Sequence, residues 1–148
     1  GVQVMETVVS WAGDAAFIGH TGSGHNVVMD GPPEGGGRNL GPRPMEMLLL
    51  GMGACTAYDV VSILRKSRQS VHDCRVEVSA ERADDHPKVF TRIHTHFIVI
   101  GENLEEKAVE RAVRLSADKY CSASLMLGKT AQISHDFEIN TPAATATG

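Results

Sequence analysis

Three short stretches of apolar and β-branched residues mark the first thirty positions of the chain. They cover residues 2–11, 16–18 and 26–30, and the turn-forming runs Gly13-Asp14 and Gly22-Ser23-Gly24 separate them. Short glycine-containing turns between such stretches are typical of β-hairpins. The pattern predicts a three-stranded β-meander.

A segment rich in glycine and proline follows at residues 31–43 and predicts a loop, because neither a helix nor a strand persists in such a sequence. A loop of this length is either a plain connector or a mobile flap beside a functional site. Both interpretations are open, and the second draws support from the helix that comes directly after the loop.

Residues 44–66 have the pattern of a long apolar helix. Glu46 and Asp59 are its only charged residues before its basic end. A helix that is apolar nearly all round is expected to be buried on most of its sides. Its interior glycines, Gly51 and Gly53, each cost about 1 kcal/mol relative to alanine. We therefore expect the backbone of a second helix or a second subunit to approach closely there.

The second half of the chain alternates between strand and helix patterns. On the strand predicted at residues 89–100, Phe97 and its alternate neighbours share one side, while His94 and His96 face the other. Asn103 is predicted to be the N-cap of the next helix, with Glu106 as its partner three residues on. The expected elements are strands at 71–82, 89–100 and 131–139 and helices at 104–120 and 122–128.

These elements predict a single domain over residues 1–140, followed by a disordered tail at 141–148. The chain has 148 residues, of which 42% are hydrophobic and 22% charged, as in ordinary globular proteins. Its net charge of -4 argues against nucleic acid as a partner.

The longest apolar stretch, residues 47–58, is shorter than the roughly 20 residues that span a bilayer, so we expect no membrane association. The first eleven residues alternate and carry Glu6, unlike a signal peptide. We therefore expect a cytoplasmic protein.

The three cysteines are the main candidates for chemistry. Their odd number and wide spacing fit neither a disulfide framework nor a zinc ribbon, and they indicate a reducing compartment. Cys55 lies in the long apolar helix, where a thiol is either a small core residue or a reactive group. Cys121 is predicted at the start of a short helix, where unpaired backbone N–H groups would lower its pKa. Cys74 is predicted to be structural.

His94 and His96 raise the question of a metal site, because they share one face of a strand. No carboxylate or cysteine stands at ligand spacing beside them in the sequence. Paired histidines on a strand are more often surface residues, so we predict no metal site. The sequence also predicts no cofactor.

Two segments together carry a resemblance to a known family. Residues 41–61, with Gly51-Met52-Gly53-Ala54-Cys55, resemble the first cysteine helix of the OsmC/Ohr superfamily, and Tyr120-Cys121-Ser122 resembles its second cysteine motif. Their order and their separation of 66 residues also fit. The resemblance covers residues 2–139 and is closest to the YhfA-like branch.

The resemblance implies an α+β fold in which two sheets wrap around long central helices of an intertwined homodimer. It implies a thiol-based redox protein that reduces organic hydroperoxides or hydrogen peroxide in a pocket at the dimer interface. Cys55 would be the peroxidatic thiol, Cys121 would form a disulfide with it, and an external dithiol would reduce the pair.

The sequence departs from the peroxidase pattern at two places. Residues 13–25 lack the arginine that stabilises the thiolate, and Glu46 stands one position after the place of the family's glutamate. Arg43 and Glu46 are the candidate polar support for the thiol pair in this chain. Without a cation the Cys55 thiol would react slowly, which favours the alternative of a non-peroxidase protein that binds a small hydrophobic ligand or senses redox state.

Overall fold

The computed structural model describes residues 1–143, and it divides the chain into two compact units, Gly1–Leu49 and Leu50–Gly148. The chain forms two three-stranded sheets, each with an antiparallel strand pair, together with helices, so the α+β class is confirmed. The predicted tail at 141–148 lies mostly outside the described residues. The prediction of a single domain over residues 1–140 stays a prediction.

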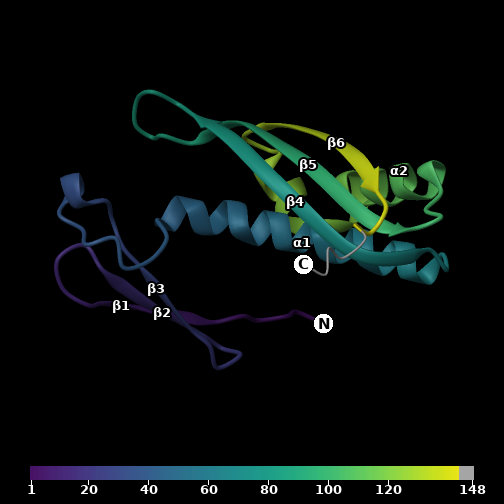
Figure 1. Ribbon diagram of the computed structural model, residues 1–148. Coiled ribbons are helices and arrows are strands. Elements are labelled where there is room, and N and C mark those ends of the chain that lie inside the picture. Colours follow the sequence, from purple (N-terminus) through teal and green to yellow (C-terminus); the bar gives the residue numbers. More distant parts are fainter. Residues whose placement is uncertain (144–148) are drawn as a thin grey trace, which may run out of the picture. The chain divides into compact units, whose positions relative to one another are not determined.

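The first unit contains a three-stranded antiparallel sheet, which confirms the predicted meander (Figure 1). Its strands are β1 (Thr7–Trp11), β2 (Phe17–Thr21) and β3 (Asn26–Met29), paired in that order. Gly13 and Asp14 both have positive φ in the turn between β1 and β2, which is why residues that tolerate the left-handed region stand there.

This sheet has almost no core of its own within one chain. All five residues of β1 are exposed, and Trp11 and Val8 keep 70% and 62% of their surface accessible. Apolar side chains on a sheet normally pack against another layer. The first unit therefore presents an apolar surface that has no covering layer within the unit itself.

The loop at 31–43 is held by the buried carboxylate of Asp30. One of its oxygens accepts a hydrogen bond from the backbone N–H of Gly31, and the other accepts from those of Arg38 and Leu40. Burial alone would raise the pKa of Asp30, but these three donors lower it below its usual value. A short 3-10 turn, η1 (Pro33–Gly35), lies inside the loop. The carboxylate thus fixes the path of a segment that has little other regular structure.

We expect Asp30→Asn to lower the melting temperature at pH 7, because an amide NH₂ would face backbone N–H groups that need an acceptor. The folded pKa of Asp30 is lowered, so its stabilisation is complete above the unfolded value of about 3.9 and is lost as pH falls through the folded value. The difference in melting temperature should therefore shrink below about pH 4. Glu34→Gln, at an exposed position in the same loop, is the control. An equal difference at pH 7 and pH 3 would contradict this role.

Helix α1 (Pro44–Lys66) has the predicted bounds. At its start the side chain of Glu46 accepts a hydrogen bond of 2.7 Å from the backbone N–H of Arg43, the reciprocal half of a capping box. By length and composition α1 could cross a membrane, since its most apolar window has a mean hydropathy of 1.7. Core helices of water-soluble proteins meet the same two conditions, so this is weak evidence for a membrane span.

The expectation that α1 is buried on most sides is wrong for the single chain. Its buried residues are Met52, Thr56, Val60 and Leu64, which recur every four positions and so form one narrow stripe. At Gly53 an added Cβ would lie 3.3 Å from the Val78 side chain, whereas at Gly51 it would meet nothing within 4 Å. One chain therefore covers only one face of the helix, and the close approach at Gly53 comes from a strand side chain.

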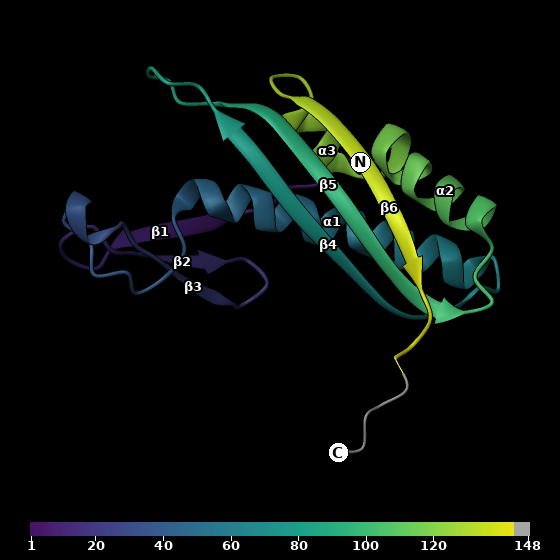
Figure 2. The ribbon, with the colours of Figure 1, turned by 45° about the horizontal axis from the view of Figure 1, so that its top comes forward.

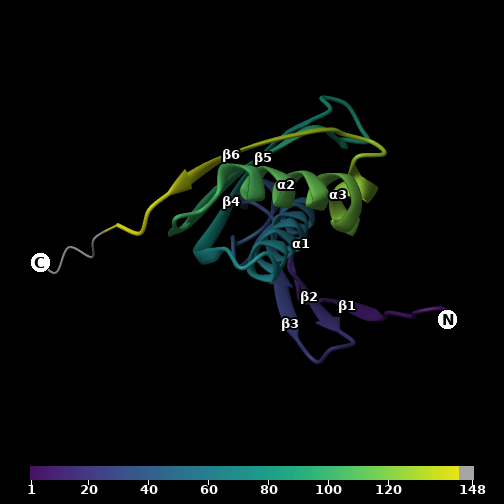
Figure 3. The same ribbon diagram turned by 90° about the vertical axis from the view of Figure 1, so that its right-hand side faces the viewer.

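The second unit contains a sheet of β4 (Ser70–Arg82), β5 (Phe90–Glu102) and β6 (Gln132–Asn140), with β5 in the middle (Figure 2). Strands β4 and β5 are antiparallel, and β5 and β6 are parallel. The residues predicted to share one side of β5 do so, and this side faces inward: Ile93, Phe97 and Val99 are at most 1% exposed. The helices pack against this side of the sheet (Figure 3).

The helix predicted at 104–120 is an α-helix only in its first part, whereas the short helix predicted at 122–128 is confirmed. Helix α2 (Glu106–Leu115) gives way to a π-helical turn, η2 (Ser116–Tyr120), and α3 (Ser122–Leu127) follows. The predicted N-cap is also wrong. Asn103 adopts positive φ, Glu105 is the N-cap, and its N–H donates to the side chain of Gln69. A long-range hydrogen bond replaces the local capping box.

Candidate functional site

The structure brings Cys55 and Cys121 together within the second unit. Cys55 comes from α1, and Cys121 lies at the junction of η2 and α3. The two sulfur atoms and a carboxylate oxygen of Asp59 all lie within 4.8 Å of one another. A disulfide needs the sulfurs about 2.05 Å apart, so the two side chains would have to move closer for the bond to form. We call these three residues the thiol cluster.

Local structure explains how each member reaches the cluster. Cys55 and Asp59 stand one helical turn apart on α1, so they share a face. The backbone N–H of Cys121 donates to the carbonyl of Ser116 at 2.8 Å, the five-residue spacing of a π turn. This wider turn ends the helical run at Cys121 and leaves its side chain free to cap α3.

Cys121 is fully buried, whereas Cys55 is half-buried. The Cys121 sulfur accepts hydrogen bonds from the Ser124 backbone N–H at 3.3 Å and from the Ser124 hydroxyl at 3.0 Å. Burial raises the pKa of the Cys121 thiol, and the neighbouring Cys55 raises it further; the Ser124 donors only partly offset these effects. The predicted lowering of its pKa by a helix N-terminus is therefore wrong, because desolvation outweighs the local donors.

Two buried hydroxyl groups, those of Thr56 and Ser116, form a hydrogen-bond network with the Asp59 carboxylate of the cluster. The Ser116 hydroxyl lies 2.7 Å from that of Thr56 and donates to Asp59 Oδ2 at 2.9 Å. It restrains the orientation of the carboxylate. Sequence reasoning missed this network, although the spacing of Asp59 and Cys55 on a predicted helix could have pointed to the carboxylate.

A hollow of about 450 Å³ begins at Asp59 and runs along α1. Its wall carries two aromatic rings, Tyr58 and Tyr120, and two cations, Lys66 and Arg111. Such a mixture suits a ligand that has both an apolar body and a polar or anionic end. The cations line the hollow, but among residues 50–143 no cation forms a hydrogen bond or ion pair with either sulfur.

Arg43 and Glu46 have local partners in the first unit. The Arg43 guanidinium donates to the Asn39 side chain at 2.8 Å and to the Gly41 carbonyl at 3.2 Å. Glu46 caps α1 through the backbone of Arg43. These contacts account for both side chains as supports of the loop and the helix start. Their support of the thiol pair stays a prediction.

Cys74 lies on β4, apart from the thiol cluster, and packs against the core. Burial, together with the neighbouring Asp73, raises the pKa of its thiol to about 11. A thiol with so high a pKa stays protonated near neutral pH and is a poor nucleophile. This environment fits the predicted structural role.

The histidines of β5 belong to the outward side of the sheet, not to the thiol cluster. Asp136 on β6 accepts from both, at 2.9 Å from His94 Nε2 and 2.7 Å from His96 Nδ1. The hydrogen bond to Asp136 raises the pKa of His96. No carboxylate stands at ligand spacing beside these histidines in the sequence, and only the parallel pairing of β5 and β6 brings Asp136 next to them.

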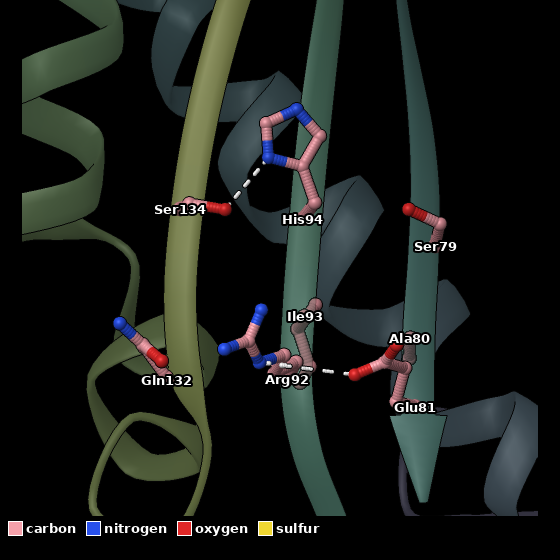
Figure 4. Close-up of a pocket in the computed structure, with 8 residues that line it drawn as sticks. All are labelled: Ser79, Ala80, Glu81, Arg92, Ile93, His94, Gln132 and Ser134. Atoms are coloured by element: carbon pink, nitrogen blue, oxygen red, sulfur yellow. Dashed lines mark hydrogen bonds and ion pairs between the residues drawn. The ribbon is translucent and has the colours of Figure 1, made fainter.

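A shallow hollow of about 610 Å³ lies beside these histidines on the same sheet (Figure 4). His94 reaches across to the hydroxyl of Ser134 at 2.7 Å, and Arg92 pairs with Glu81 at 3.8 Å. The lining mixes apolar and polar residues, four of its polar side chains are paired with one another, and among the described residues no group of metal-ligating side chains converges there. The thiol cluster is therefore the stronger candidate site.

Comparison with known proteins shows the family to which this chain belongs. The family model described as OsmC-like protein matches residues 35–136, and the chain belongs to this family. It is 47% identical to Protein YhfA of Escherichia coli K12 over 135 residues, which is 91% of this chain and 98% of that protein. The predicted family and its YhfA-like branch are confirmed.

Solved structures extend the likeness of the fold. A hypothetical protein from Aquifex aeolicus VF5 is 32% identical, with a TM-score of 0.84 and coverage of 95% of this chain and 99% of that one. A Legionella pneumophila protein described as an organic hydroperoxide resistance protein and predicted redox protein has a TM-score of 0.65 at 14% identity, covering 97% and 99%. The second likeness shows the fold alone, and the OsmC-like fold is confirmed.

Proposed function

We propose that this chain is a thiol-based redox protein that reduces organic hydroperoxides or hydrogen peroxide through Cys55 and Cys121. One observation carries the proposal: two cysteine sulfurs from distant parts of the chain lie within 4.8 Å of each other, one fully buried and one half-exposed. Converging cysteines of unequal exposure suit a pair that forms and breaks a disulfide.

Unequal burial assigns the two roles. Cys55 is the one that a peroxide can reach, so its thiolate attacks the distal oxygen of the O–O bond. That bond breaks, the leaving alkoxide (or hydroxide, from hydrogen peroxide) takes up the proton that the Cys55 thiol released, and Cys55 becomes a sulfenic acid. The hollow that begins at Asp59 provides room for the organic part of the peroxide.

Cys121 completes the reaction. Its sulfur attacks the sulfenic sulfur of Cys55, the S–S bond forms and the hydroxyl leaves as water. Because the raised pKa of Cys121 keeps its proton in place, the step needs a base, and the Asp59 carboxylate is within reach. An external dithiol then reduces the disulfide, as a reducing cytoplasm would supply.

A second function stands beside this one. The absence of a cation at the sulfurs among residues 50–143, and the apolar and cationic lining of the hollow, favour a protein that binds a small hydrophobic ligand or senses redox state. Such a protein would gain thermal stability with a ligand but would not turn over peroxide.

The test of the peroxidase proposal is a reaction with one equivalent of hydroperoxide per chain. Reduced protein is mixed with one equivalent of an organic hydroperoxide in the presence of a chelator, and peroxide loss and disulfides are followed by rapid quench and mass spectrometry. The proposal expects peroxide loss well above that of free thiols and a Cys55–Cys121 disulfide. Consumption at the free-thiol rate would overturn the peroxidase reading and leave the binding or sensing function.

We further propose that the chain functions as a homodimer, because α1 and the first sheet leave apolar surface uncovered. Leu50 on α1 is 61% exposed, and Trp11 on β1 is 70% exposed. At Gly51 an added Cβ would meet nothing within 4 Å, so the helix has room for the close approach of another backbone, which supports the proposal. Exposed apolar surface of this kind marks an interface.

We expect Leu50→Glu to weaken the dimer roughly a hundredfold, since burying a carboxylate in an apolar interface costs about 3 kcal/mol or more. Sedimentation equilibrium measures the association constant. Arg65→Glu, at an exposed polar position of the same helix, is the matched control. A monomeric wild-type protein at micromolar concentration would be evidence against the proposal.

A further inference from the structure

We propose that the reduced thiol cluster, Cys55, Asp59 and Cys121, is also a binding site for one thiophilic divalent cation of the zinc class. Two thiolates and one carboxylate oxygen would be its protein ligands, and the fourth position would be open. The binding itself does not depend on the peroxidase activity proposed above.

The distances suit a tetrahedral ion. With Zn–S near 2.3 Å and Zn–O near 2.0 Å, ligand sulfurs stand about 3.8 Å apart and a sulfur and an oxygen about 3.5 Å apart. The three ligand atoms already lie within 4.8 Å of one another. Side-chain movements of about 1 Å therefore convert the cluster into a coordination shell.

The groups behind the ligands are those that a metal site needs. Ser124 directs two hydrogen-bond donors at the Cys121 sulfur, and such donors stabilise a thiolate. The Ser116 hydroxyl donates to Asp59 Oδ2 and so restrains the orientation of the carboxylate. Hydrogen bonds of this kind orient ligands and add 10–100-fold to metal affinity, as an order of magnitude.

The types of ligand atom determine which ions the site can bind. Two sulfurs favour zinc or a similar borderline-soft cation, whereas Mg²⁺ and Ca²⁺ require oxygen ligands. Within the described residues the cluster has three members, and Cys55 and Asp59 are half-buried. Solvent or a small ligand can therefore reach the fourth position, as in open zinc sites.

Ion binding and disulfide formation exclude each other, because each requires both sulfurs. A bound ion would hold Cys55 and Cys121 reduced, and an oxidised pair could not bind the ion. This consequence rests on the proposed redox function, and it would make the ion a regulator of that function.

Cobalt(II) is the probe, because thiolate coordination gives charge-transfer absorption and a tetrahedral site gives intense visible bands. Reduced wild-type protein is titrated anaerobically with Co²⁺, and Zn²⁺ is then added. We expect one Co²⁺ per chain, with both spectral features, and displacement by Zn²⁺. Cys55→Ser and Cys121→Ser should each reduce the charge-transfer absorption, and Asp59→Asn should weaken binding at least tenfold.

Controls within the chain separate this site from general thiol binding. Cys74→Ser and Asp73→Asn should bind Co²⁺ as the wild type does, and Ser116→Ala should weaken binding without removing a ligand. Circular dichroism confirms that each variant is folded. Titration without charge-transfer absorption, or absorption that survives Cys55→Ser and Asp59→Asn unchanged, would overturn the proposal.

The regulatory consequence has a separate readout. One equivalent of Zn²⁺ should slow diamide-driven formation of the Cys55–Cys121 disulfide, and a chelator should restore the rate. An unchanged rate with Zn²⁺ bound would overturn mutual exclusion. The peroxide assay contains a chelator, so failure of the metal site and failure of the peroxidase reading are distinguishable.

Discussion

Replacing Cys55 with serine is expected to lower the rate of hydroperoxide reduction by roughly 1,000-fold or more, because a serine hydroxyl cannot replace the attacking sulfur. Cys121→Ser is expected to behave differently. Cys55 remains half-exposed in that variant and can still attack one equivalent of peroxide. Without the resolving thiol the sulfenic acid accumulates, and turnover stops.

The measurement is a single-turnover quench followed by labelling with a sulfenic acid reagent and intact-mass analysis. Label should appear on Cys121→Ser after one equivalent of peroxide and should not appear on Cys55→Ser. Cys74→Ser is the matched control, because its thiol lies apart from the cluster and has a pKa of about 11. Activity that survives in Cys55→Ser would show that the peroxide reacts elsewhere.

Phe97→Ala is expected to cost about 3–5 kcal/mol of unfolding free energy, the range for a buried aromatic ring. Phe97 is 1% exposed and lies in the core cluster formed with residues of α1 and α2. Domains of this size have about 5–15 kcal/mol in total, so the variant should be close to unfolding. Urea denaturation followed by far-UV circular dichroism measures the change.

Ile98→Ala on the same strand is the control, since its side chain lies on the other side of the sheet and is only partly buried. We expect it to cost clearly less than Phe97→Ala. The two substitutions remove apolar side chains from adjacent residues, so a comparable loss in both would mean that the outward side of β5 is also covered.

The periodicity of apolar residues in the sequence was sufficient to predict where most strands and helices lie. The meander, the long helix at 44–66 and the two long strands appear close to where their patterns place them. These patterns report local preferences and the side of an element that faces the core. Phe97 and its alternate neighbours are buried because strand side chains alternate, a rule that needs no tertiary information.

The structure of the segment around Cys121 could not be predicted from local sequence patterns. Apolar spacing continues through 104–120, yet the backbone changes to a π-helical turn at Ser116, whose hydroxyl is buried against Thr56 and Asp59. Asn103 has the composition of an N-cap, but a hydrogen bond to Gln69 across the fold fixes another helix start. In both cases a long-range polar contact outweighed a local preference.

The sequence by itself determined the family, the elements and the two cysteine motifs, because these depend on residue type and spacing along one chain. The tertiary structure decided which thiol is buried, that Asp59 joins the pair, and that burial raises the pKa of Cys121. It also placed Asp136 beside the histidines through the parallel pairing of β5 and β6. Desolvation and contacts between distant segments exist only after the chain has folded, so no local pattern encodes them.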